Sequence, residues 1–328
     1  MTADLPVLPL APEQIFERIE LIRAQVQQAF IGQPGVLDEL LVALLAGGHV
    51  LLEGAPGLGK TLLARALAAS LSLSFARVQF TPDLMPSDLS GHAFYDPKSE
   101  GFKIRRGPVF TQMLLADEIN RAPAKTQAAL LEVMQEQQVT IESKSFQLAP
   151  PFMVLATQNP IEQEGTYPLP EAQLDRFLLK ISIGYPTARE EIEMVSAISH
   201  GRTAQDFDLS AVRAVADGPT LIAMQLGVAQ STVDAGLIDY AVRLVRATRD
   251  NPQFALGAGP RGSLGLIRAA RAKAALSGRD FATPDDVRAV LKPALRHRVM
   301  LAAEMQIEGR HVDQLLEQLL QSVRAPQK

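Results

Sequence analysis

The sequence of 328 residues contains no cysteine, which excludes disulfide bonds and metal sites built on thiolates. It has no apolar stretch near the roughly twenty residues that span a bilayer. The first twelve residues lack the basic and long apolar parts of a secretory signal. A strong charge imbalance is missing as well, since the net charge is only −4. These absences predict a cytoplasmic protein with no membrane partner and no general attraction to nucleic acid.

What the sequence does contain is a glycine-rich loop, Gly54-Ala55-Pro56-Gly57-Leu58-Gly59-Lys60-Thr61. The apolar run 49–52 before it predicts a short buried strand, and the segment that begins at Leu62 predicts a helix. Between a strand and a helix, small residues let backbone N–H groups face a polyphosphate, and the helix adds the positive end of its dipole. Lys60 would neutralise the outer phosphates and the Thr61 hydroxyl would ligate Mg²⁺. The flanking elements disfavour the alternative, a glycine turn that binds nothing.

The rest of the chain divides into parts with different patterns. Apolar runs that predict five strands alternate with helices up to residue 186, and such alternation is typical of a parallel sheet flanked by helices. Two hairpins are predicted as inserts, one within 91–110 and one within 139–148. We find no convincing strand from Thr187 onward. The predicted domains are an arm at 1–12, an α/β nucleotide-binding domain at 13–186 and a small helical domain at 187–328.

Polar residues follow two of the predicted strands. Asp117 and Glu118 end the run Met113–Ala116, so their carboxylates would emerge at the sheet edge where such folds bind ligands. Beside a phosphate loop, Asp117 suits the water shell of Mg²⁺ and Glu118 suits the orientation or deprotonation of an attacking water. Asn159 follows another strand and could hydrogen-bond that water, but it precedes a proline and could equally be a turn residue.

A break between two predicted helices contains Ile31 and Gly32. A loop at this point could flank an adenine ring, which would make both residues part of the cofactor site. An ordinary helix–helix turn is about as well supported by the spacing.

Together these motifs resemble an AAA+ ATPase. The resemblance adds Leu174-Asp175-Arg176-Phe177 before the last strand and Gly259-Pro260-Arg261 in the helical domain. The sequence segments 79–88, 117–122 and 156–160 make the chain similar to the MoxR group in particular. The match runs from about Gln14 to the late helices.

The resemblance implies a role for each motif. Lys60 and Thr61 match the Walker A contacts, and Asp117 and Glu118 match the Walker B pair. Asn159 matches sensor 1. By the same resemblance, Arg176 is the arginine finger supplied to a neighbouring subunit, and Arg261 is sensor 2 from the lid. A guanidinium fits the finger role, because it can neutralise charge on a transferring phosphoryl group.

The family implies a Mg²⁺-dependent ATPase that forms a homo-oligomeric ring, expected to be a hexamer, and remodels or matures a client protein. A protein with a von Willebrand factor A (VWA) domain is expected as adaptor, in enzyme assembly or metal-cofactor insertion. Two alternatives stay open: a motor that translocates nucleic acid, and a nucleotide-gated binding module with little hydrolysis. The short basic run Arg296-His297-Arg298 is interpreted as a solvated helix face.

Overall fold

The computed structural model describes residues 7–160, 165–199 and 209–326. At its centre lies a sheet with the strand order β2–β5–β8–β1–β9, in which all neighbours run parallel. The predicted parallel five-stranded sheet is therefore confirmed. Its strands are β1 (Val50–Glu53), β2 (Phe75–Gln79), β5 (Met113–Asp117), β8 (Met153–Gln158) and β9 (Leu179–Ser182).

Helices cover both faces of this sheet, because parallel strands need crossovers that pack against it. Alternate residues of one strand enter different cores: Leu115 packs with the helices of one face, and Leu114 with those of the other. All five residues of β5 are buried. The flanking elements are α1 (Pro12–Gln27), α2 (Pro34–Leu45), α3 (Lys60–Ser70), η1 (Ile119–Arg121), α5 (Ala124–Glu136), α6 (Glu171–Leu174) and α7 (Ala188–Ser199).

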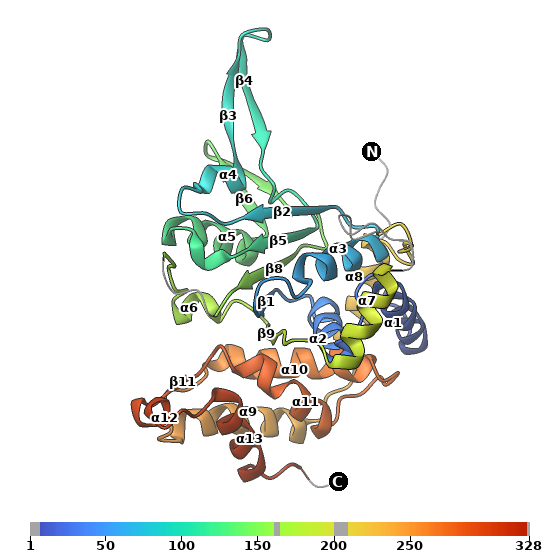
Figure 1. The fold of residues 1–328 in the computed structure, drawn as a ribbon, viewed down its shortest axis with the longest axis vertical. Helices are drawn as coiled ribbons and strands as arrows, with labels where there is room; N and C mark the ends of the chain where they lie inside the picture. Colours follow the sequence, from blue (N-terminus) through green and yellow to red (C-terminus); the bar gives the residue numbers. More distant parts are fainter. Residues whose placement is uncertain (1–6, 161–164, 200–208, 327–328) are drawn as a thin grey trace.

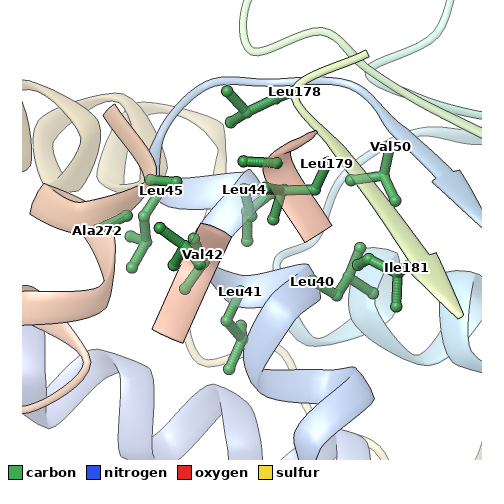
Figure 2. Packing of buried hydrophobic residues seen from close by; sticks show 14 of the residues in the cluster. Leu40, Leu41, Val42, Leu44, Leu45, Val50, Leu178, Leu179, Ile181 and Ala272 are labelled. Carbon is green, nitrogen blue, oxygen red and sulfur yellow. The ribbon is translucent and has the colours of Figure 1, made fainter. Parts of the chain in front are cut away.

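Helix α2 connects the sheet to the C-terminal helices. Its seven buried residues are all apolar. Figure 2 shows Leu40 and Leu44 near Leu179 and Ile181 of β9, with Ala272 of α10 (Pro260–Ala275) in the same cluster. Because each fully buried leucine contributes about 2 kcal/mol, this shared core holds the C-terminal part against the edge of the sheet.

Both predicted hairpins are present. The first, β3 (Gly91–Asp96) with β4 (Gly101–Arg106), follows the short helix α4 (Pro86–Ser90) and projects far from the body of the molecule in Figure 1. The second pairs β6 (Gln138–Ile141) with β7 (Lys144–Gln147) directly after α5.

The C-terminal part is mainly helical, as predicted, but it also contains a two-stranded antiparallel sheet, β10 (Phe254–Leu256) with β11 (Met300–Leu301). These strands were not predicted, because two or three residues are too few to show an alternating pattern. Thr283 caps α11 (Pro284–Leu295) by accepting a hydrogen bond from the Asp286 backbone N–H. The remaining helices are α8 (Gly218–Ala229), α9 (Ala235–Asp250), α12 (Ala303–Ile307) and α13 (Val312–Ser322). No helix in the described ranges is both long and apolar enough to cross a membrane.

The interpretation of Arg296-His297-Arg298 as a solvated helix face is wrong. Helix α11 ends at Leu295, and the chain then turns toward β9, so His297 and Arg298 are both buried. The helical periodicity that predicted an exposed face does not extend to these three residues.

Candidate functional site

The phosphate loop lies between β1 and α3, as the sequence predicted. Gly59 adopts a left-handed backbone with φ of 78°, which suits glycine, and helix α3 begins at the next residue, Lys60. A Cβ added to Gly54 would lie 2.5 Å from the carbonyl oxygen of Ile183. Only glycine therefore fits where the loop leaves the sheet.

The loop and the ends of the strands enclose one cavity of about 400 Å³. Lys60 extends back over the loop and donates hydrogen bonds to the carbonyl oxygens of Gly54 (2.6 Å) and Ala55 (3.2 Å). Leu58 packs instead against the hydrophobic core. The cavity is lined by Pro56, Gly57, Gly59, Lys60, Thr61, Leu62, Arg65, Arg77, Gln79, Asp117, Glu118 and Asn159. The structure thus brings most of the predicted phosphate and metal residues together.

Asp117 is held by side chains from both neighbouring strands. The Thr157 hydroxyl on β8 donates to its Oδ1 (2.6 Å), and Arg77 on β2 donates to its Oδ2 from Nε (3.0 Å) and Nη2 (2.7 Å). Thr157 also accepts a hydrogen bond from the backbone N–H of Glu118 (2.8 Å). The carboxylate at the end of β5 therefore has a fixed orientation.

Glu118 sits in a left-handed backbone conformation with φ of 56°, a costly arrangement that is common at functional sites. Its carboxylate accepts a hydrogen bond from Gln79 Nε2 (2.7 Å) and pairs with Arg121 (3.2 Å). Gln79 on β2 and Arg121 on η1 thus hold the Glu118 carboxylate at the rim of the cavity.

The oxygen donors in this cavity fit Mg²⁺. Thr61 offers a hydroxyl and Asp117 a carboxylate, the hard ligands that this ion prefers beside phosphates. Asn159, 6% exposed, lines the same cavity just beyond β8.

The loop with Ile31 and Gly32 lies beside the phosphate loop. A Cβ on Gly59 would lie 3.3 Å from the ring of Phe30. The Gln33 backbone N–H donates to the carboxylate of Glu190 on α7 (2.7 Å), which ties the loop to a second segment. This position suits the adenine interpretation of the loop, which stays a prediction.

Arg176 and Arg261 lie elsewhere, in a second cavity of about 370 Å³ that shares no lining residue with the first. Arg268 and Arg298 line it too, and Asp175 is the single acid among its lining residues. Arg261 lies 3.9 Å from Asp175, and Arg176 donates to the carbonyl oxygen of Leu131 on α5 (2.6 Å).

The two cavities lie at opposite ends of strand β1. Gly47, Gly48 and His49, which precede β1, line the arginine cavity, and the phosphate loop follows β1. A strand of four residues spans about 13 Å. A nucleotide in the phosphate loop is therefore separated from the arginine cavity of the same chain by the length of the strands.

Sequence reasoning missed Arg77, Gln79 and Thr157. Thr157 lies on β8 two residues before Asn159, and this spacing along an extended chain is a signal that could have found it. Arg77 and Gln79 share a face of β2 in the same way, but only the strand order puts β2 next to β5.

Comparisons with known proteins agree with this geometry. Residues 49–179 match the profile of the ATPase family associated with various cellular activities (AAA), and residues 246–319 match that of the AAA lid domain. The chain is 44% identical to the chaperone MoxR1 of Mycobacterium tuberculosis, over 92% of this chain and 81% of the relative. It is 43% identical to the uncharacterized protein YeaC of Bacillus subtilis, over 92% of both chains.

A crystal structure of a proposed ATPase from Cytophaga hutchinsonii is similar throughout. It superimposes with a TM-score of 0.88 at 39% identity, covering 96% of this chain and 97% of that one.

Proposed function

Since this chain belongs to the MoxR family of AAA+ ATPases, we propose that it hydrolyses ATP with Mg²⁺ as a ring of identical subunits and uses the energy to remodel a partner protein. The observation that carries this proposal is the division of the charged groups into two separate cavities. Each cavity holds half of what phosphoryl transfer needs, so a head-to-tail ring would complete both.

The cavity at the phosphate loop, here called the phosphate-loop half of the site, binds the nucleotide and orients the attacking water. Lys60 leaves its carbonyl partners to contact the outer phosphates, and backbone N–H groups at the start of α3 face the others. Thr61 and Asp117 would hold Mg²⁺, which when bound neutralises charge on the phosphates. Glu118 orients or deprotonates the attacking water, and Asn159 donates a hydrogen bond at the same point.

The arginine cavity, here called the arginine half of the site, contacts the nucleotide of the neighbouring subunit. Arg176 and Arg261 line a cavity with four arginines and a single acid, which is an environment for an anion. Arg176 lines this cavity, and its buried Nε has no hydrogen-bond partner within the described ranges. We assign Arg176 as the arginine finger and Arg261 as the lid arginine that joins it.

The names of the relatives support the proposed kind of partner. One relative is named a chaperone and others are named MoxR, and these names support a role in remodelling or maturing a client protein. We propose a hexameric cytoplasmic ring with a VWA-domain protein as adaptor, acting in enzyme assembly or metal-cofactor insertion.

Steady-state ATPase assays on Glu118→Gln and Arg176→Ala test the assigned roles. Both variants are expected to bind ATP, and turnover is expected to fall by at least about a hundredfold in each, since a catalytic carboxylate and an arginine finger each stabilise the transition state. Wild-type turnover in both variants would overturn the proposal.

A further inference from the structure

The segment 296–298 connects the lid to the turn that carries Arg176. All three side chains donate hydrogen bonds to the stretch between that turn and the end of β9. Arg296 donates to the Ser182 hydroxyl (2.8 Å), and His297 contacts the Phe177 carbonyl oxygen through Nε2 (3.0 Å). This segment follows directly on helix α11 of the lid.

Arg298 makes the closest connection. Its Nε donates to the carboxylate of Asp175 (2.8 Å), and its Nη2 donates to the carbonyl oxygens of Phe177 (2.7 Å) and Asp175 (3.3 Å). Its Nη1 donates to the carbonyl oxygen of Leu178 (3.1 Å) and to that of Ala294. The side chain is only 4% exposed, so these bonds are made away from water.

The guanidinium of Arg298 makes more contacts than its ion pair alone. An ion pair with a single carboxylate would satisfy its charge, yet the guanidinium also binds three backbone oxygens on both sides of Arg176. Because the fork geometry of arginine fixes the direction of several bonds at once, it can set the shape of the turn. Asp175 is shared with Arg261, which lies 3.9 Å away at the start of α10.

We propose that Arg298 is a positioning residue for Arg176: it holds the turn 175–178 from the lid, so that movement of the lid moves the arginine offered to the neighbouring subunit. This inference rests on the proposed function of Arg176 as the arginine finger. It makes the lid of one subunit a regulator of hydrolysis in the next.

The test is the variant Arg298→Lys in the full-length protein. Lysine keeps the charge, but its three donors on one nitrogen cannot reproduce the bonds that the three guanidinium nitrogens make to Asp175 and the backbone oxygens. Because small misplacements of a catalytic group cost up to about a hundredfold in rate, we expect kcat to fall about tenfold or more. The affinity for a fluorescent ATP analogue should stay within about twofold, since the phosphate loop lies at the other end of strand β1.

Mixed rings separate positioning from a merely structural role. Glu118→Gln subunits keep an intact turn but do not hydrolyse, and Arg298→Lys subunits keep an intact phosphate loop. Mixing them should restore activity above that of either variant alone, because a Glu118→Gln neighbour supplies a well-placed Arg176. A mixture as inactive as its parts would overturn the inference.

Two further variants complete the design. Arg296→Lys changes the neighbouring residue, which contacts β9 beyond the turn, and it should keep wild-type turnover. Asp175→Asn removes the same ion pair from the other side and replaces Arg298→Lys if that protein does not fold.

The failure of the inference can be told apart from the failure of the proposed function. If Arg176→Ala itself keeps full turnover, the proposed function fails. If Arg176→Ala loses turnover while both Arg298→Lys and Asp175→Asn keep it, only the inference about Arg298 fails.

Discussion

The two cavities of this molecule differ in charge and in how their side chains are held. The phosphate-loop cavity combines Lys60, Arg65 and Arg77 with two acids, and strand ends position its groups. The arginine cavity has four arginines against one acid, and contacts between the lid and a turn position its groups. The first half is therefore built by local sequence, and the second by the packing of two distant parts of the chain.

Lys60→Ala should give the largest effect, because it removes the one lysine of the phosphate loop. We expect the affinity for ATP to fall by at least about a hundredfold, since a charge-assisted contact to phosphate is lost. Equilibrium binding of a fluorescent ATP analogue measures this effect. An affinity close to that of the wild type would contradict the assignment of this cavity as the phosphate-binding site.

Arg261→Ala tests the other half. Its side chain lines the arginine cavity, away from the phosphate loop of the same chain, so ATP affinity should stay within about threefold. We expect kcat to fall about tenfold or more, because a transition-state contact is lost. ATP titrations of steady-state turnover separate the two parameters. A large loss of binding with kcat unchanged would place Arg261 in the phosphate-loop half and break the comparison.

Thr157→Val keeps the shape of the side chain but removes the hydroxyl that fixes Asp117 and the backbone of Glu118. We expect kcat to fall several-fold and the free energy of unfolding to fall by about 1–3 kcal/mol, because the buried Asp117 carboxylate loses a donor and the partly buried Glu118 N–H loses its acceptor. Urea denaturation and turnover assays measure both effects. Thr157→Ser restores the hydroxyl and should recover most of each; equal losses in the valine and serine variants would contradict the assigned bonds.

The smallest expected effect is a pH dependence of stability caused by His49, which lines the arginine cavity. The pKa of His49 is lowered to about 4, because burial, together with the nearby Arg268, outweighs the effect of the hydrogen bond to the Met134 carbonyl oxygen. Between this pKa and the ordinary value of 6.5, the unfolded state binds the proton and the folded state does not, so stability falls as the pH drops.

We expect the free energy of unfolding to decrease by about 1 kcal/mol from His49 between pH 7.5 and pH 5.5. Urea denaturation at both pH values measures it, and His49→Gln should reduce the decrease. A variant with the full wild-type pH dependence would show that His49 is not its source.

The phosphate-loop half could be predicted because its signals are local. The glycine spacing, Asp117 after an apolar run and the flanking strand and helix are all visible within short windows, and the structure brings these residues into one cavity. Arg77 and Gln79 were missed because their meaning depends on β2 lying beside β5, which is a property of the whole sheet.

The arginine half could be predicted only in part. Arg176 and Arg261 were named through resemblance, but no spacing reveals that they line one cavity. The burial of Arg298 could not be read from the sequence either, because a basic run beyond a helix ordinarily stays in water. Most of the partners of this arginine come from the contact between the lid and the turn 175–178.

Mixing Glu118→Gln subunits with Arg176→Ala subunits tests most directly whether the two cavities form one site across a subunit boundary. Each variant alone should be nearly inactive. In an equal mixture, a quarter of the interfaces pairs an intact phosphate-loop half with an intact arginine, so the account predicts turnover of about a quarter of the wild-type rate. A mixture that stays as inactive as the separate variants would contradict it.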